Sequence, residues 1–276
     1  MEMLRSNLRK MIATDEQPVA YTLPLGNERL PVNPLLGKTL RLAYNGQIQC
    51  IGCRQLTKKS FNQGFCFRCF STLAQCDLCV VKPELCHFAK GTCREPEWGQ
   101  THCMQPHYVY LANASGLKVG ITRGNQIPTR WLDQGAVQAL PVIQVQSRHH
   151  AGLVEVAFKK HISDRTDWRK MLKGEPETHD LAAQREDLFS RCEKDLSSVL
   201  EGGVENSLTR LAKEAVRTFV YPVLTYPTRV TALNLDKTPT VEGTLLGVKG
   251  QYLIFDTGVL NVRKFAGYNV EIFFST

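Results

Sequence analysis

The chain has 276 residues, of which 43% are hydrophobic and 22% charged. This length exceeds the ~100–200 residues of a common domain, so we expect two or three modules with hydrophobic cores, and no run reaches the ~18 apolar residues of a membrane helix. The formal charge of +8 and the pI near 9.0 favour a polyanionic partner such as nucleic acid, although a basic surface that only maintains solubility explains the same charge.

The first ten residues, MEMLRSNLRK, lack the apolar core of a signal peptide. We therefore expect a cytoplasmic protein whose thiols are reduced. A disulfide framework is the alternative use of its cysteines, but such frameworks are typical of short secreted chains.

Residues 1–49 are predicted to form a β-rich N-terminal extension. Short apolar stretches within 20–49 are interrupted by glycines and prolines, and Asn45-Gly46 is a strong signal for a hairpin turn. We expect this hairpin to lead into the next module.

Nine of the ten cysteines fall between Cys50 and Cys103, which defines a Cys-rich module at 50–107. Cys50 and Cys53 form one C-x2-C pair, and Cys66 and Cys69 form a second pair after a twelve-residue spacer. Two such pairs place four thiolates around one Zn²⁺. The sequence therefore predicts a zinc site at these four residues.

The remaining cysteines of the module predict a second metal site with an open ligand set. Cys76 and Cys79 form a third C-x2-C pair, and Cys86, Cys93 and Cys103 follow, with His87, His102 and His107 between or just beyond them. Zinc is one occupant, and an iron–sulfur cluster is the alternative, because five cysteines that are not all in close pairs also suit a cluster.

Basic and aromatic residues alternate around the second C-x2-C pair. Lys58, Lys59 and Arg68 are candidate nucleic-acid contacts, since basic and aromatic side chains together bind phosphates and stack on bases. Phenylalanines 61, 65 and 67 are expected instead to cover the small core of the zinc module.

Residues 108–162 predict the order β-β-α-β-α. Two strands joined by a turn at 113–116 precede a helix that begins at Pro128, a buried strand at 139–146 and an amphipathic helix at 150–162.

The C-terminal third is predicted to contain two further helices and then strands. An amphipathic helix is expected at 180–201, with Cys192 on its buried face, and another at 206–219. From residue 231 onward, turn signals separate apolar strands every eight to ten residues, as in a small SH3-like or OB-like barrel.

The segment from Tyr108 to Glu155 resembles the GIY-YIG endonuclease domain. Tyr-Val-Tyr at 108–110 stands where the family has its first signature, and Lys118-Val119-Gly120-Ile121-Thr122 where it has its second. Arg130 and Glu155 match the positions of the family's catalytic arginine and metal-binding glutamate. The whole chain also resembles an uncharacterised bacterial family in which a Cys-rich module precedes a nuclease-like domain.

This resemblance implies a small α/β fold and metal-dependent phosphodiester hydrolysis. Glu155 would hold Mg²⁺ or Mn²⁺, Arg130 would stabilise the charge that develops on phosphate, and Tyr110 would position or deprotonate the attacking water. Lys118 replaces the family's second-signature tyrosine and is a candidate phosphate-binding or pKa-lowering group. Arg123 and Lys159 are candidate nucleic-acid contacts beside these residues.

Ordinary structural roles remain the alternative for each position. Glu155 and Lys159 have the spacing of an exposed helix pair, Tyr110 that of a core residue, and Arg130 a partner in Asp133. Tyr108 also stands where the family has glycine.

The predicted fold class is α+β, with modules at 1–49, 50–107, 108–228 and 229–276, and the zinc-binding module is expected to be β-rich. The 108–228 module comprises the GIY-YIG-like domain and a helical extension, and 229–276 is the small β module. The leading function is a zinc-containing, structure-specific endonuclease. The alternatives are a non-catalytic zinc adaptor that binds nucleic acid or a repair or translation partner, and an iron–sulfur or redox-sensing regulator.

Overall fold

The N-terminal and C-terminal strands belong to one open, seven-stranded antiparallel sheet. Its order is β1 (Glu2–Asn7), β15 (Tyr268–Phe274), β5 (Thr39–Gln49), β12 (Thr240–Lys249), β13 (Tyr252–Phe255) and β14 (Gly258–Asn261), and β6 (Leu56–Thr57) extends β5. This computed structural model describes residues 2–201 and 208–275. The expected C-terminal barrel is wrong, because within the described residues the sheet does not close and the C-terminal strands pair with β1 and β5.

The predicted hairpin turn at Asn45-Gly46 is also wrong. β5 continues through these residues, and an irregularity in its pairing with β15 accommodates them. Gly46 has φ +86°, and the Asn45 side-chain amide donates to Asn269 Oδ1 at 2.5 Å. The strand does not reverse because β15 supplies its partner from the far end of the chain.

A three-stranded sheet packs on the same core. It consists of β2 (Ile12–Thr14), β3 (Ala20–Leu25) and β4 (Glu28–Pro31), followed by the short 3-10 helix η1 (Asn33–Leu35). Alternate residues of β3 are buried, as expected for a strand with one face on a core. This core joins both sheets to Trp131 and Tyr110 of the central region.

The Cys-rich segment contains short helices and turns in place of a β-rich module. Its elements are α1 (Phe67–Thr72), the 3-10 helices η2 (Ala74–Cys76), η3 (Leu78–Val80), η4 (Pro83–Leu85) and η5 (Phe88–Lys90), and α2 (Pro96–His102). Few apolar side chains are buried here, since its small core consists of Phe65 and three cysteines.

The central region has the predicted order β-β-α-β-α. These elements are β7 (His107–Asn113), β8 (Leu117–Arg123), α3 (Thr129–Asp133), β9 (Gln138–Val145) and α4 (Arg148–Phe158), with η6 (Gly124–Gln126) before α3. Successive residues of β7 point to opposite faces, so Tyr110 packs in the core with α3 whereas Val109 and Leu111 pack in a second core with α4.

Two helices cover the second core after α5 (Trp168–Met171). The predicted helix at 180–201 is broken at Cys192 into α6 (Leu181–Arg191) and α7 (Glu193–Glu201), and Cys192 is buried as expected. The predicted helix at 206–219 is wrong for 208–219, since β10 (Leu208–Arg210) and β11 (Arg217–Thr218) pair with β9. Residues 206 and 207 lie outside the described residues.

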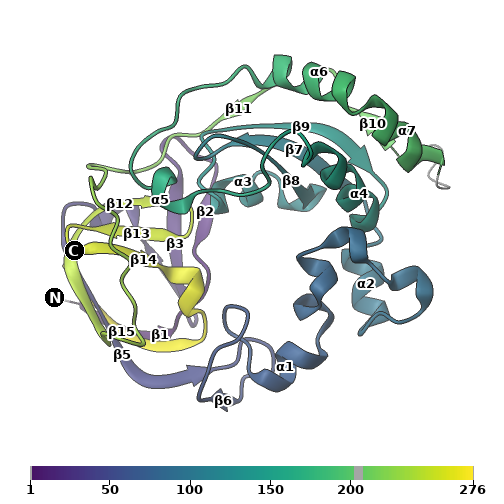
Figure 1. The fold of residues 1–276 in the computed structure, drawn as a ribbon. Helices are drawn as coiled ribbons and strands as arrows, with labels where there is room; N and C mark the ends of the chain where they lie inside the picture. Colours follow the sequence, from purple (N-terminus) through teal and green to yellow (C-terminus); the bar gives the residue numbers. More distant parts are fainter. Residues whose placement is uncertain (1, 202–207, 276) are drawn as a thin grey trace.

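Figure 1 shows these parts arranged as a ring. The large and the three-stranded sheets form the left side, and the central sheet with its helices forms the top. The Cys-rich segment runs from the end of β5 past α1 and α2 to β7 and completes the ring at the bottom and right. The chain is therefore α+β, as predicted.

None of the described helices combines the length and apolarity that crossing a membrane requires.

Candidate functional site

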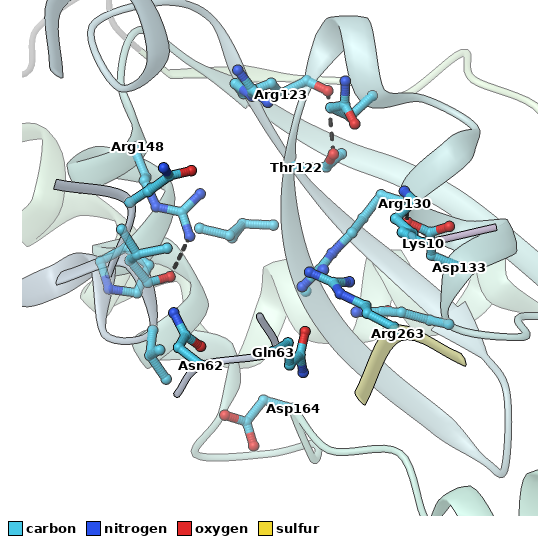
Figure 2. Close-up of a pocket in the computed structure, with 18 of the residues that line it drawn as sticks. Lys10, Asn62, Gln63, Thr122, Arg123, Arg130, Asp133, Arg148, Asp164 and Arg263 are labelled. Carbon is cyan, nitrogen blue, oxygen red and sulfur yellow. Dashed lines mark hydrogen bonds and ion pairs between the residues drawn. The ribbon is translucent and has the colours of Figure 1, made fainter. Parts of the chain in front are cut away.

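A cavity of about 830 Å³ lies where all parts of the ring face one another. The loop between β1 and β2 contributes Arg9 and Lys10, the Cys-rich segment contributes Asn62 and Gln63, and the C-terminal 3-10 helix η7 (Val262–Phe265) contributes Arg263. Further side chains come from β7, β8, α3, α4 and the turns at η3 and η4, and Figure 2 shows Thr122, Arg130 and Arg148 among them. The cavity therefore exists only in the complete tertiary structure.

The lining is strongly basic. Seven basic side chains and four acidic ones line the cavity: Arg9, Lys10, Lys118, Arg123, Arg130, Arg148 and Arg263, against Asp77, Asp133, Glu155 and Asp164.

Three of the four acids have cationic partners other than the cavity's arginines. Lys10 forms an ion pair with Asp133. Asp77 pairs with Arg94 at 2.7 Å, and Asp164 pairs with Lys159 at 3.0 Å. These acids therefore do little to neutralise the arginines.

Five arginines of the lining have no acidic partner. In the described part of the chain, Arg9, Arg123, Arg130, Arg148 and Arg263 form no ion pair. Among the same residues, the buried Nε atoms of Arg130 and Arg148 also have no hydrogen-bond partner, although one Arg148 terminal nitrogen donates to Val80 O at 2.6 Å. Burial lowers the pKa of Arg263, and the nearby charge of Arg130 lowers it further. Unpaired guanidinium groups so close together are typical of a site for an anion.

Tyr110, Lys118 and Gln134 form one hydrogen-bond network in the wall. The Tyr110 hydroxyl donates to Gln134 Oε1 at 3.0 Å, and Lys118 Nζ donates to the same oxygen at 2.6 Å. Tyr110 lies opposite Gly120 in the β7–β8 ladder, and an added Cβ at Gly120 would meet the phenolic oxygen at 2.6 Å. The glycine therefore leaves the space that the tyrosine ring occupies.

Burial shifts the pKa values of this network in opposite directions. It lowers the pKa of Lys118 to about 8, and the neighbouring Arg130 also lowers it. Burial raises the pKa of Tyr110, with Arg130 partly opposing that rise. The amine therefore loses its proton near neutral pH more readily than the phenol does.

Glu155 lies on the face of α4 that lines the cavity. The helix begins at the cap Ser147, whose hydroxyl accepts from His150 N, and packs Val154 and Phe158 against the sheet. Burial raises the pKa of Glu155 to about 6, and Lys159 partly counteracts this rise. The Glu155 carboxyl is thus ionised at neutral pH and is the one acid of the lining with no ion pair among the described residues.

Gly152 lets the Cys-rich segment approach α4 closely. An added Cβ at Gly152 would lie 2.6 Å from Glu84 N and from Pro83 Cβ of η4. Gly152 and Glu155 are three residues apart, and residues at this spacing share one face of a helix. The contact with η4 therefore lies beside Glu155.

The four residues predicted to be catalytic meet in this cavity. Tyr110, Lys118, Arg130 and Glu155 line it, and so does Arg123. The alternative ion pairs considered for them are not formed, since Asp133 pairs with Lys10 and Lys159 pairs with Asp164.

The other predicted nucleic-acid contacts lie elsewhere. Lys58, Lys59 and Arg68 are exposed residues of the first Cys loop and of α1, outside the cavity lining. Lys159 is held by Asp164 at the edge of the cavity. No local pattern marked Arg148 or Arg263 beforehand, because each lies beside the site only after distant segments have packed together.

Phe65 and Phe67 differ in burial. Phe65 is buried in its small core as predicted, whereas Phe67 is 65% exposed, so the expectation that it covers the core is wrong. Phe67 and Phe70 both contact the ring of Phe61, and Lys59 lies over that ring. These side chains form a small aromatic surface next to the first four cysteines.

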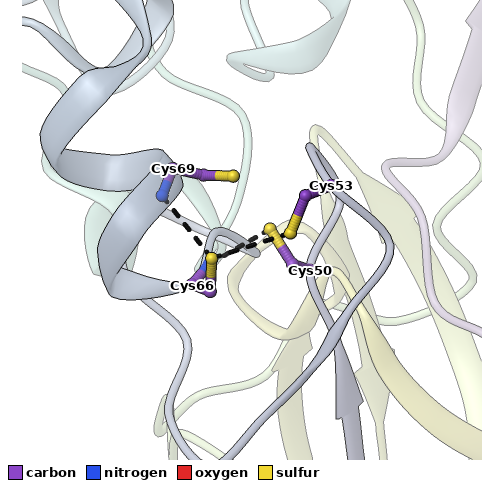
Figure 3. Close-up of side chains that lie close together, drawn as sticks. All are labelled: Cys50, Cys53, Cys66 and Cys69. Atoms are coloured by element: carbon purple, nitrogen blue, oxygen red, sulfur yellow. Dashed lines mark hydrogen bonds between the residues drawn. The ribbon is translucent and has the colours of Figure 1, made fainter.

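The first four cysteines are arranged as a metal site. The sulfurs of Cys50, Cys53, Cys66 and Cys69 all lie within 4.8 Å of one another (Figure 3). The first pair follows the end of β5, and the second pair stands at the N-terminus of α1. Four sulfurs so close together are geometrically suited to one tetrahedral zinc ion.

Backbone amides prepare these sulfurs to bind a cation. Cys66 N donates to Cys50 Sγ at 3.2 Å, and Cys69 N donates to Cys66 Sγ at 3.5 Å. Burial by itself raises the pKa of Cys50, but amides of Cys53, Cys66 and Gly52 outweigh it and lower that pKa to about 6. One thiolate thus forms readily at neutral pH, as metal binding requires.

Comparison with protein families identifies the chain's relatives. A family model described as "Protein of unknown function (DUF2797)" matches residues 37–270 of the 276 residues. The chain belongs to the DUF2797 family. Neither the curated proteins nor the solved structures gave a match. The resemblance to GIY-YIG endonucleases therefore stays a prediction, and the DUF2797 match spans the Cys-rich segment, the central sheet and most of the C-terminal strands.

Proposed function

We propose that this DUF2797 protein binds an unpaired segment of nucleic acid in the basic cavity and hydrolyses a phosphodiester bond there. The observation that carries the proposal is the group of five arginines that line the cavity without acidic partners among the described residues. Buried cations without partners are costly, and phosphate oxygens are well matched to guanidinium groups.

The size of the cavity supports an unpaired substrate. A volume of about 830 Å³ is within the range of sites that enclose a small molecule, which is enough for a nucleotide but not for a duplex. The segment that enters is then a single-stranded end or a nucleotide turned out of its stack.

The residues of the wall have distinct tasks in this proposal. Arg130 and Arg263 hold the phosphate and stabilise the charge that develops on it. The Lys118 amine accepts a proton from water as the water oxygen bonds to phosphorus. The bond from phosphorus to the leaving oxygen breaks, and that oxygen takes a proton from solvent. Lys118 suits this role better than Tyr110 because its pKa lies near 8 whereas that of the phenol is raised.

The donor set at Glu155 fits a hard divalent cation. Mg²⁺ and Mn²⁺ take oxygen ligands and commonly use one or two carboxylates with a substrate phosphate, and Glu155 and Asp164 both line the cavity. A cation held by Glu155 would supply further stabilisation of charge at the phosphate.

The first Cys site has a structural role in this proposal. A zinc ion on its four sulfurs would fix the loop between the two cysteine pairs, and this loop places Asn62 and Gln63 in the cavity wall. The exposed aromatic surface at Phe67 and Phe70 would guide the rest of the strand by stacking on its bases.

The decisive experiment uses labelled single-stranded, duplex and branched DNA and RNA with Mg²⁺ or Mn²⁺. Wild type and Glu155→Gln are compared with Glu242→Gln, a matched change at an exposed carboxylate of β12. We expect cleavage near unpaired nucleotides by wild type and the control, and none by Glu155→Gln. Binding without cleavage by all three would make the cavity a recognition site, as in the adaptor alternative. Absence of binding would refute the proposal.

A further inference from the structure

Four cysteines of the second group surround a small cavity of their own. Cys79, Cys86, Cys93 and Cys103 line it, with Phe88 and Trp98 among the residues that complete its wall. These cysteines come from four separate turns, at or next to η3, η4, α2 and the segment between η5 and α2. The fold therefore brings together four thiols that are far apart along the chain.

The fifth cysteine of the group packs beside the first four-cysteine site instead. Cys76 is buried with Cys50, Phe65 and Cys69 in one small core. It does not line the second cavity. The sequence did not indicate which of the five cysteines act together. The structure groups Cys79, Cys86, Cys93 and Cys103.

The two cysteine sets differ in geometry. The four sulfurs of the first set lie within 4.8 Å of one another, as one small ion requires. Among the described residues, the four sulfurs of the second set do not all lie so close together, and they line a small cavity. The potential ligands within 4.8 Å of one another in that region are Asp77, Cys79 and His87. A polynuclear cluster holds its cysteine sulfurs farther apart than one zinc ion does, because metal and sulfide atoms lie between them.

The sequence spacing of the second set also differs from that of a structural zinc site. Six residues separate Cys79 from Cys86, six separate Cys86 from Cys93, and nine separate Cys93 from Cys103. None of these intervals is the C-x2–4-C pair typical of structural zinc sites.

The proximity of Asp77 and His87 has an explanation that needs no metal. Arg94 binds the Asp77 carboxylate at 2.7 Å, and His87 Nε2 lies 3.5 Å from the same group. The carboxylate also accepts from Cys79 N at 3.4 Å as the cap of η3, and His87 Nδ1 contacts the Thr92 hydroxyl at 2.8 Å. Both side chains are therefore already engaged in holding the turns around the cavity.

We propose that Cys79, Cys86, Cys93 and Cys103 bind a [4Fe–4S] cluster. Four thiolates are the usual ligand set of such a cluster. Phe88 and Trp98 would shield the cluster from water. The ion pair between Arg94 and Asp77 would cover the side of the cluster that faces α1. When a preassembled cluster is transferred from a carrier, each iron would exchange one carrier ligand for a cysteine sulfur, the cysteine proton would pass to the departing ligand, and no oxidation state would change.

The position of the cluster connects it to the main cavity. Asp77, Val80 and Pro83 line that cavity from the turns that carry Cys79 and Cys86. Val80 O accepts from Arg148, and η4 packs against α4 at Gly152. The cluster would therefore hold in place the wall that faces Glu155, independently of what the main cavity binds.

The test measures iron, acid-labile sulfide and zinc in protein purified without oxygen from cells supplied with iron. We expect about four iron and about four sulfide per chain, with a visible absorbance band, and about one zinc at the first site. Cys93→Ala should lose the iron, the sulfide and the absorbance but keep the zinc. Cys76→Ala is the matched control, and we expect it to retain the iron, the sulfide, the absorbance and the zinc.

Two results would overturn the proposal. One is protein that holds about two zinc ions and no iron or sulfide, even after incubation with ferric iron, a thiol reductant and sulfide under anaerobic conditions. The other is a cluster that survives in Cys93→Ala and is lost in Cys76→Ala. Zinc retained by Cys93→Ala shows that the variant is folded around the first site.

Discussion

Tyr110 lies across Gly120 on the neighbouring strand, in the space that a Cβ at residue 120 would occupy. The two residues face each other in the β7–β8 ladder, and the added Cβ would stand 2.6 Å from the phenolic oxygen. This contact explains why residue 120 is glycine, because no larger residue leaves room for the ring that reaches Gln134.

Gly120→Ala should therefore displace Tyr110 and break its hydrogen bond to Gln134. We expect a loss of about 1–3 kcal/mol in the free energy of unfolding, the usual cost of overpacking a core. Urea denaturation measures the change. Gly174→Ala is the control, because an added Cβ there meets nothing within 4 Å. Equal effects of the two substitutions would show that Tyr110 has room to move.

Lys118→Met should stabilise the protein while it removes the proposed activity. Burial lowers the pKa of Lys118 from its ordinary 10.5 to about 8, so keeping the amine charged opposes folding. The unfolded chain holds its proton up to a higher pH than the folded one does. The penalty is therefore complete below about pH 8 and decreases as pH rises toward 10.5.

At pH 7 we expect the Lys118→Met variant to be about 1–3 kcal/mol more stable than wild type. Gln134 Oε1 keeps the Tyr110 hydroxyl as a donor, so the substitution leaves no orphaned acceptor. Urea denaturation across pH 6–10 measures the difference. A stability gap that widens with rising pH would contradict the assignment of a low pKa to this amine.

Removal of one unpaired guanidinium should weaken binding of a short single-stranded oligonucleotide. We expect Arg130→Met and Arg263→Met each to lower affinity and to reduce the slope of log K against log salt concentration by about one. Fluorescence anisotropy at several salt concentrations measures both quantities. Arg68→Met is the comparison, because Arg68 is exposed on α1 and lies outside the cavity lining. A larger effect of Arg68→Met would move the binding surface to the first Cys loop.

Loss of the first metal site should loosen one wall of the cavity and spare the central sheet. We expect Cys53→Ser to lose about one zinc per chain and to raise amide hydrogen exchange across residues 50–72, because few apolar side chains hold this loop. Exchange in β7 and β9 should stay slow, since their core does not include the loop. Unchanged exchange at 50–72 after loss of the metal would show that packing alone holds the loop.

Local sequence patterns predicted the features that depend on neighbouring residues. The two C-x2-C pairs predicted the tight four-sulfur site, and periodicity predicted the β-β-α-β-α order and the burial of Cys192. Spacing along one strand or helix determines which side chains share a face, so these features need no knowledge of distant partners.

The tertiary structure decided everything that depends on which distant segments meet. β5 continues through Asn45-Gly46 because β15 pairs with it, and for the same reason the C-terminal strands join the N-terminal sheet instead of closing a barrel. Arg263 reaches Arg130, and Cys76 separates from the other four cysteines, only through contacts between segments remote in sequence. The sequence therefore indicated which residue types form the site. It did not indicate the charge balance of the site, because an arginine is known to be unpaired only when the tertiary structure shows which acids lie beside it.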